Sequence, residues 1–243
     1  MPRSILITGA SGGIGRATAE HFGAKGWIVG LTARRADKLA QVAAGIERAV
    51  IIPADLTRPE QVEAAFADFA KQAGRLDVLF NNAGIFTPAA PIDEVSLDNW
   101  HAAMDVNLNA MFYCARAAFA TMRAQSPQGG RIINNGSISA HSPRPGSVTY
   151  TVSKHAITGL TKTISLDGRP FNIACGQIDI GNARTDLLQG IIDAAMEAGE
   201  APPPTMDVAD VARAVYYMAD LPGEANVLNM TLMATKMEHV GRG

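Results

Sequence analysis

Short apolar segments rich in β-branched residues alternate along this chain with longer segments in which apolar residues recur at helical spacing. The short segments predict seven strands, at residues 4–8, 27–32, 49–53, 77–80, 131–135, 171–175 and 226–232. The longer segments predict helices at about 14–25, 36–44, 59–73, 97–125 (in one or two pieces), 149–166 and 208–219. Strands that are apolar throughout are typical of a parallel sheet buried between two layers of helices.

This alternation predicts the α/β class. We expect a single Rossmann-like, doubly wound domain over residues 1–243, with a parallel sheet of about seven strands and helices on both faces. A closed eight-stranded barrel uses the same alternation, but it needs more strand–helix units than this chain offers. The composition agrees with one globular domain, because 47% of the 243 residues are hydrophobic and 18% are charged.

Charge and cysteine content narrow the function classes. A formal net charge of -2 gives no general attraction to nucleic acid or to an anionic membrane, so neither is a predicted partner. The chain starts directly with an apolar strand, and no segment reaches the ~18 apolar residues of a membrane span, so we expect a cytoplasmic protein. Cys114 and Cys175 lie in apolar segments without a CxxC motif or a nearby histidine cluster, which predicts buried thiols and no metal site.

A glycine-rich turn, TGASGGIG at residues 8–15, follows the first predicted strand and opens the first predicted helix. Glycines let the backbone turn tightly and approach a pyrophosphate, and the free N–H groups at a helix start bind phosphate oxygens. The turn therefore predicts dinucleotide binding, although its spacing is not the strict GxGxxG of the Rossmann fingerprint. The alternative is a loop that only turns the chain. The predicted contacts are Gly9, Ser11, Gly12, Gly13, Ile14 and Gly15.

Tyr150 and Lys154 lie four residues apart in YTVSK, on a predicted helix. Residues at this spacing share one helix face, so the phenol and the ammonium are predicted neighbours. A nearby cation favours the phenolate and lowers the pKa of a tyrosine. Taken alone, such a pair is more often an ordinary exposed tyrosine and lysine.

Five motifs that occur in a fixed order favour a functional role for Tyr150 and Lys154 over that of an ordinary exposed pair. They are TGASGGIG at 8–15, NNAG at 81–84, Asn107 in MDVNL, Ser137 in INNGSIS, and YTVSK at 150–154. Together they resemble the short-chain dehydrogenase/reductase family over residues 2 to about 180. The resemblance implies hydride transfer between a nicotinamide and a small carbonyl or alcohol substrate.

The resemblance also implies the catalytic roles. Tyr150 is the general acid/base, and Lys154 stabilises its phenolate and binds the nicotinamide ribose. Ser137 holds the substrate oxygen, with Ser139 as the nearby competitor for that role. Asn107 helps to order a water in a proton relay behind the lysine, although a satisfied buried amide is the alternative for an asparagine in an apolar helix.

The second predicted strand ends in Thr32-Ala33-Arg34-Arg35, which bears on the cofactor. An NAD site usually has an acid at the position of Ala33, whereas Arg34 and Arg35 suit the 2′-phosphate of NADP. We therefore expect NADP(H), with NAD(H) left open because Asp37 could reach back. The resemblance further implies that Asp55 and Leu56 lie near the adenine, and that Asn82, Ala83 and Gly84 lie beside the ribose.

The segment after the sixth predicted strand departs from the family pattern. The family commonly has Pro-Gly followed by a threonine that binds the cofactor, whereas this chain has residues 175–182, CGQIDIGN. Gly176 matches the family glycine. Contacts to the carboxamide are expected from the backbone of Ile178, from Asn182 or from Thr185, and the sequence does not distinguish these three.

Apolar residues recur at helical spacing from 185 to 200 and are followed by three prolines. This pattern predicts a substrate lid at about 181–205 that closes over the active site, or else a helix that packs on the core or on a neighbouring subunit. The broad apolar faces predicted at 104–122 and 152–164 indicate a homodimer or homotetramer.

The alternative to an NADP(H)-dependent oxidoreductase is a non-catalytic NADP-binding regulator of the same fold. A sugar-nucleotide epimerase usually needs a longer substrate domain than 243 residues allow.

Overall fold

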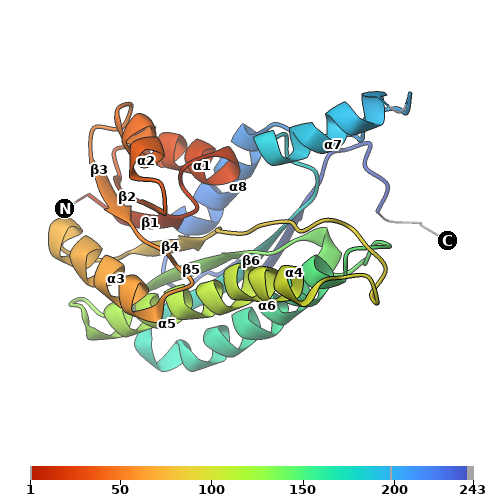
Figure 1. Ribbon diagram of the computed structural model, residues 1–243. Helices are drawn as coiled ribbons and strands as arrows, with labels where there is room; N and C mark the ends of the chain where they lie inside the picture. Colours follow the sequence, from red (N-terminus) through yellow and green to blue (C-terminus); the bar gives the residue numbers. More distant parts are fainter. Residues whose placement is uncertain (1, 198, 240–243) are drawn as a thin grey trace.

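A parallel sheet forms the centre of the molecule, seen in a computed structural model that describes residues 2–197 and 199–239 (Figure 1). The strand order is β3-β2-β1-β4-β5-β6-β7, and every neighbouring pair is parallel. The prediction of a Rossmann-like doubly wound α/β fold is therefore confirmed. The strands are β1 Ser4–Thr8, β2 Ile28–Ala33, β3 Ala49–Pro53, β4 Val78–Asn81, β5 Gly130–Asn135, β6 Ile173–Ile180 and β7 Asn229–Leu232.

Helices cover both faces of this sheet. Figure 1 shows α1, α2 and α8 on one face and α3, α4, α5 and α6 on the other. Helix α7 lies beyond the sheet, at the upper right of that view. The helices are α1 Gly13–Ala24, α2 Ala36–Ala43, α3 Pro59–Ala73, α4 Leu97–Met104, α5 Ala110–Ala124, α6 Val148–Asp167, α7 Asp186–Glu197 and α8 Val208–Asp220. In the part of the chain that the structure describes, no helix is long and apolar enough to cross a membrane.

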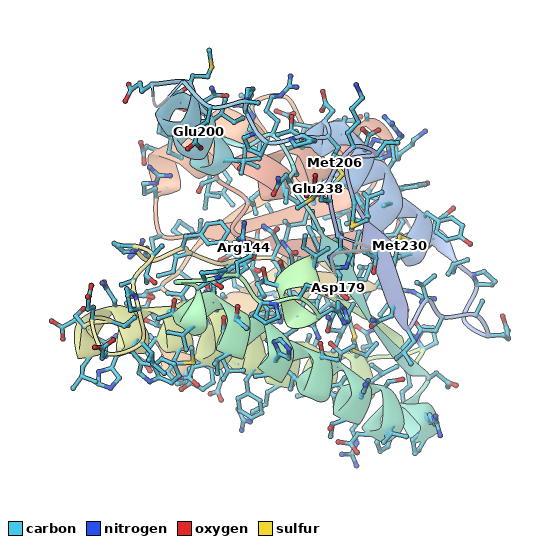
Figure 2. All side chains as sticks on the ribbon, turned by 90° about the vertical axis from the view of Figure 1, so that its right-hand side faces the viewer. Arg144, Asp179, Glu200, Met206, Met230 and Glu238 are labelled. Carbon is cyan, nitrogen blue, oxygen red and sulfur yellow. The ribbon has the colours of Figure 1, made fainter. Side chains whose placement is uncertain are left out.

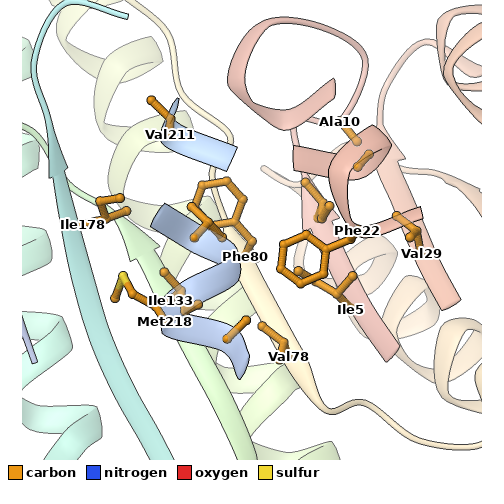
Figure 3. Packing of buried hydrophobic residues seen from close by; sticks show 14 of the residues in the cluster. Ile5, Ala10, Phe22, Val29, Val78, Phe80, Ile133, Ile178, Val211 and Met218 are labelled. Atoms are coloured by element: carbon orange, nitrogen blue, oxygen red, sulfur yellow. The ribbon is translucent and has the colours of Figure 1, made fainter. Parts of the chain in front are cut away.

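Two apolar cores follow from the alternation of side chains along the strands. Ile5 and Ile7 point into one core, with α1, α2 and α8, whereas Leu6 points into the other, with α3 and α5. Figure 3 shows the first core, where Phe22 of α1 and Phe80 of β4 pack beside Ile5. The sheet is thus buried on both sides, which is why its strands are apolar throughout.

The long predicted helix at 97–125 is two helices joined by a π-helical turn, Asp105–Asn109. In that turn the Ala110 N–H bonds to the Asp105 carbonyl, five residues back. Such a turn holds one more residue than an α-helical one. Asn107 lies within it and is fully buried.

The prediction for the sixth strand is wrong in extent. Strand β6 runs from Ile173 to Ile180, not from 171 to 175. Gly176 therefore lies inside the strand, where a Cβ would come within 2.0 Å of the Val227 carbonyl oxygen. Gly181 is the glycine that directly follows the strand.

The order of the strands reverses between β1 and β4. Connections from these two strands leave in opposite directions, which opens a crevice at their carboxyl ends where ligands of such sheets bind. The glycine-rich turn follows β1, and the segment beginning with Asn82 follows β4. The fold therefore brings two of the sequence motifs to the same crevice.

Candidate active site

A cavity of about 520 Å³ occupies this crevice. Its walls come from the glycine-rich turn, the ends of β2 to β5, the start of α6 and the segment after β6. Most residues predicted for the site line it. They are Gly9, Ser11, Gly12, Gly13, Ile14, Ala33, Arg34, Arg35, Asp55, Leu56, Asn82, Ala83, Gly84, Ser137, Tyr150 and Lys154.

The backbone of the glycine-rich turn faces the cavity, and its glycines have no side chains that could cover it. Gly9 and Gly13 have φ of +67° and +51°, a left-handed conformation that side chains with a Cβ rarely adopt. Gly12 precedes α1 without any side-chain cap, and nothing lies within 4 Å of the place where its Cβ would be. The helix thus begins with uncapped N–H groups and free space in front of them.

Gly15, in contrast, does not belong to the cavity lining of the described residues. A Cβ at Gly15 would lie 2.3 Å from the Gly9 carbonyl oxygen, so this glycine allows α1 to pack against the turn. Gly15 thus has a packing role, and its contact with the cofactor stays a prediction.

Two exposed arginines, Arg34 and Arg35, mark the end of the cavity beside β2 and β3. Among the described residues, neither forms an ion pair with a carboxylate. Asp55 lies nearby, where the Thr57 hydroxyl and N–H donate to its carboxylate at 2.8 and 3.0 Å. The hydrogen bond from the Thr57 hydroxyl is the main cause that lowers the pKa of Asp55, and the charge of Arg34 contributes to the same effect.

The loop after β4 is tied to the end of β1. The N–H groups of Asn82 and Ala83 both donate to the Thr8 hydroxyl, at 2.7 and 2.9 Å. The Asn82 side chain donates to the Thr8 carbonyl and accepts from Asn135 of β5. These contacts hold the ends of β1, β4 and β5 together at the floor of the cavity.

Tyr150, near the start of α6, lines the cavity beside Ser137. Its ring packs on Phe86, with centroids 4.4 Å apart. Burial raises the pKa of Tyr150 above its ordinary value, while a hydrogen bond with Ser137 and the positive charge of Arg144 lower it.

Lys154 is bound away from the phenol. Its Nζ donates to the Asn135 carbonyl at 2.7 Å and lies 5.5 Å from the centroid of the Tyr150 ring. Burial lowers the pKa of Lys154 to about 8, and the negative charge of Asp179 acts in the opposite sense. The lysine therefore carries its charge only in part just above neutral pH.

Asn107 does not line the cavity. Its Nδ2 donates to the Ile85 carbonyl at 2.9 Å, and its Oδ1 accepts from the Ile85 N–H at 2.7 Å. The side chain is a satisfied buried amide, which was the alternative to a catalytic role. It fixes the loop between β4 and Phe86, and both of its polar atoms are already engaged.

Ile178 is misplaced by the sequence prediction. It lies inside β6, is fully buried in the first apolar core, and does not contribute to the cavity lining among the described residues. Its carbonyl accepts from the Gly136 N–H. The cavity is lined instead by Ile180 and Gly181, together with Asn182 and Thr185, which were the alternatives to Ile178.

The sequence prediction missed a buried carboxylate, Asp179, directly behind Ser137. Its Oδ1 accepts from the Ser137 N–H at 2.9 Å and from Gln177 Nε2 at 2.6 Å. Its Oδ2 lies 2.7 Å from Nε2 of His141. A Cβ at Gly136 would come within 2.0 Å of Oδ1, so that glycine makes room for the carboxylate. The sequence signal for this site is an aspartate within an apolar segment, because a carboxylate that is buried in a strand needs hydrogen-bond partners.

A dinucleotide fits these residues. The uncapped helix start and the space over Gly12 suit a pyrophosphate, and Arg34 and Arg35 suit a further phosphate at the other end. The cavity then continues to Ser137 and Tyr150. One continuous cavity thus joins the phosphate-binding turn to the phenol and the serine.

Comparison with known proteins agrees with this geometry. Residues 3–195 match the short chain dehydrogenase family. The chain belongs to that family. It is 34% identical over 189 residues to a 3beta-hydroxysteroid dehydrogenase of Mediterraneibacter gnavus, which covers 76% of this chain and 67% of that protein. The prediction of an NAD(P)-dependent oxidoreductase class is thereby confirmed.

Two further relatives span nearly the whole chain. Sulfoacetaldehyde reductase 2 of Chromohalobacter salexigens is 29% identical over 238 residues, or 96% of this chain and 94% of that protein. The crystal structure of a short chain dehydrogenase from Burkholderia cenocepacia in complex with NADP matches with a TM-score of 0.83. It has 32% sequence identity, with 96% of each chain covered. These members of one family therefore share the fold while their names indicate different substrates.

Proposed function

We propose that this protein is an NADP(H)-dependent oxidoreductase that interconverts a small carbonyl compound and the corresponding alcohol. The observation that carries the proposal is the continuous cavity from the glycine-rich turn to Ser137 and Tyr150. The NADP complex of the Burkholderia cenocepacia relative supports the choice of cofactor. Arg34 and Arg35 support it from this chain, because their guanidinium groups suit a 2′-phosphate and Asp37 lies outside the cavity lining.

In the reductive direction, Tyr150 donates its hydroxyl proton to the substrate oxygen as that oxygen gains negative charge. Ser137 holds the same oxygen, and its hydrogen bond with Tyr150 supports this arrangement. When bound, the nicotinamide supplies the hydride, which no side chain of the protein can provide. In the oxidative direction, Tyr150 accepts the proton of the alcohol.

Lys154 is assigned two roles, holding the nicotinamide ribose and stabilising the phenolate of Tyr150 by its positive charge. Its position in the cavity, one helical turn from the tyrosine, supports both. Asn107 is proposed to support the site by fixing the loop that carries Phe86, since its amide is bonded to Ile85. A proton relay through that amide would require its present hydrogen bonds to break.

The segment at 181–205 is proposed to act as the substrate lid. Gly181, Thr185 and Leu188 line the cavity, and helix α7 lies beyond the carboxyl ends of the strands (Figure 1). Within the predicted apolar stripe, the side chains of Leu187, Ile191 and Ala195 lie outside the described residues.

We also propose a cytoplasmic homodimer or homotetramer, supported by exposed apolar side chains on α5 and α6, namely Phe112, Val152 and Leu166.

The test is a screen of carbonyl and alcohol compounds against NADPH and NADH in parallel, followed by absorbance of the reduced nicotinamide. Turnover that prefers NADPH is the expected result. A protein that binds NADPH, as measured by fluorescence, but turns over no compound in either direction would instead be the non-catalytic regulator.

A further inference from the structure

A second cavity, of about 280 Å³, adjoins the catalytic cavity. Both are lined by Ile138, Ser139, Arg144 and Asn182. The second cavity continues away from the cofactor end, toward residues 203–204 and 236–239. Any substrate group that extends past Ser137 and Tyr150 therefore enters a region bordered by Arg144.

Arg144 is a free cation at this junction. None of the ion pairs formed within residues 2–197 and 199–239 includes it, and arginine keeps its charge at every working pH. Arg144 and Tyr150 line the same cavity, and the positive charge of Arg144 contributes to lowering the pKa of Tyr150. In Figure 2, Arg144 lies between the lower helices and the upper layer.

The loop that carries Arg144 is held in place on both sides. The Ser147 hydroxyl donates to the Arg144 carbonyl at 2.6 Å, at the start of α6. On the other side, His141 is held by the buried Asp179 at 2.7 Å. The Gly146 carbonyl accepts from the Ala90 N–H at 3.2 Å. The backbone of Arg144 is thus fixed before any ligand arrives, which reduces the entropy lost on binding.

The lining of the second cavity includes another cation. Lys236 lines it together with His239 and one acid, Glu238, and the structure records no ion pair for Lys236 in the described ranges. Ser139 and Ser142 line the same cavity with hydroxyl groups. The nearby carboxylate of Asp179 lines neither cavity and already accepts hydrogen bonds from Ser137 and Gln177. The region therefore combines free cations with hydroxyl donors, which suits an anion.

We propose that the substrate carries an anionic group, such as a carboxylate, sulfonate or phosphate, which binds to Arg144 at the junction of the two cavities and to Lys236 beyond it. This inference rests on the proposed function and deepens it by naming the substrate class. Arg144 and Tyr150 line the same cavity, so a short substrate can reach both. The anionic group therefore lies only a few bonds from the reacting carbonyl.

Matched substrates test this proposal with NADPH as the reductant. 4-Oxobutanoate and its methyl ester share one reacting aldehyde and differ in charge. Sulfoacetaldehyde and glycolaldehyde phosphate are compared with glycolaldehyde, so that the largest preference identifies the kind of anion. The variants are Arg144→Gln, which removes the charge, Arg144→Lys, which keeps it, and Arg169→Gln. The last is an exposed arginine outside the lining of both cavities and serves as the control.

The measured quantity is the ratio of kcat/KM for the anionic compound to that for its neutral partner. Arg144→Gln also removes a charge that lowers the pKa of Tyr150, but that loss affects both compounds and cancels in the ratio. We expect the ratio to exceed one in the wild type and to fall about tenfold or more in Arg144→Gln. Arg144→Lys should retain most of the ratio, and Arg169→Gln should leave it unchanged.

A wild-type enzyme that reduces neutral aldehydes as well as all three anionic ones would overturn the inference and leave the proposed function intact. A second measurement does not need turnover. Calorimetric titration of 4-hydroxybutanoate and 2-hydroxyethanesulfonate into the complex with NADP⁺ should show binding that Arg144→Gln loses. Absence of binding in the wild type, or equal binding in the variant, overturns the inference even when the protein or the variant shows no activity.

Discussion

The ammonium of Lys154 donates a hydrogen bond of 2.7 Å to the carbonyl oxygen of Asn135, and only 2% of the lysine is exposed. This contact links helix α6 to the carboxyl end of β5, so the lysine is part of the structure as well as of the cavity. A buried ammonium loses its hydration, and this loss is the reason that the pKa of Lys154 falls to about 8. The site is therefore built at some cost in stability.

That cost gives a prediction for Lys154→Met. In the unfolded chain the lysine keeps its proton up to about 10.5, but in the folded protein only up to about 8. Between these values the unfolded state binds more protons, so the stability of the wild type rises with pH. At pH 7 the charge of the buried lysine destabilises the folded wild type by about 3 kcal/mol. Lys154→Met removes this cost but also loses the hydrogen bond to Asn135, which offsets about 1 kcal/mol of the gain.

We therefore expect Lys154→Met to unfold at higher urea than the wild type at pH 7 without cofactor, by about 1–3 kcal/mol in free energy. The difference should shrink as the pH rises from 8 to 9.5, while activity is lost at every pH. A variant that is less stable than the wild type at pH 7 would show that the lysine is not penalised by its burial.

Tyr150→Phe tests the general acid/base. The variant keeps the ring that packs on Phe86 but lacks the proton that is transferred, so kcat should fall by about 10²- to 10⁴-fold. NADPH binding, followed by fluorescence, should change little. Tyr217→Phe is the control, since Tyr217 is 56% exposed. Turnover near the wild-type level in Tyr150→Phe would reject the assigned role.

Helices and strands in which apolar residues recur at regular spacing were predictable from the sequence, and so were motifs formed by neighbouring residues. Strand β3 and helix α3 have the predicted bounds, because their apolar patterns are interrupted by turn residues on both sides. The glycine-rich turn and the Tyr150–Lys154 pair are local, and their residue types define them. The π-helical turn was not predictable, because one added residue leaves the apolar pattern of a helix almost unchanged.

Strand β6 shows what a single sequence hides. Its second half contains Gln177 and Asp179, which are polar and which a local pattern excludes from a buried strand. Both are fully buried because their partners come from distant parts of the chain. Gln177 bonds to Thr161 of α6, and Asp179 bonds to Ser137 and His141. The fold has to be known before such partners can be paired, so the end of the strand was predicted wrongly and the role of Asp179 was not predicted.

Substitution of the turn glycines by alanine should weaken NADPH binding at Gly12 and lower the stability of the protein at Gly15. A methyl group at Gly12 meets nothing within 4 Å, and its φ of -176° suits any residue, so Gly12→Ala should keep the wild-type melting temperature. The methyl group would occupy the space in front of the helix start, so NADPH binding should weaken about tenfold or more.

Gly15→Ala should instead destabilise the protein, because its methyl group would lie 2.3 Å from the Gly9 carbonyl oxygen. We expect a cost of about 1–3 kcal/mol, measured as a lower melting temperature. If both variants melt as the wild type does and both bind NADPH normally, the turn is not a phosphate cradle.

Arg34→Asp tests the cofactor preference. The guanidinium is assigned to the 2′-phosphate, which NADH lacks, so the affinity for NADPH should fall at least about tenfold more than that for NADH. Arg116→Gln is the control, since Arg116 pairs with Glu63 on the surface, away from the cavity lining. Equal losses for both cofactors would show that Arg34 has only a structural role.

Asp179→Asn examines the buried carboxylate behind Ser137. The amide oxygen can still accept from the Ser137 and Gln177 N–H groups, and its NH₂ group faces His141, which can accept through its neutral nitrogen. These contacts are thus kept while the negative charge is lost, and only the Asn229 amide, which donates to Oδ2 at 3.4 Å, loses its acceptor. That charge raises the pKa of both Tyr150 and Lys154, so its removal should lower both.

In the oxidative direction the phenol must lose its proton, so activity rises with pH as the tyrosine ionises. The acidic limb of the profile of kcat/KM against pH should therefore shift to lower pH in Asp179→Asn, whereas the exposed Glu224→Gln should leave it in place. An unchanged limb, together with a lower kcat, would mean that Asp179 positions Ser137 without acting electrostatically on the phenol. A shifted limb would identify Asp179 as a residue that sets the working pH of the site through charge.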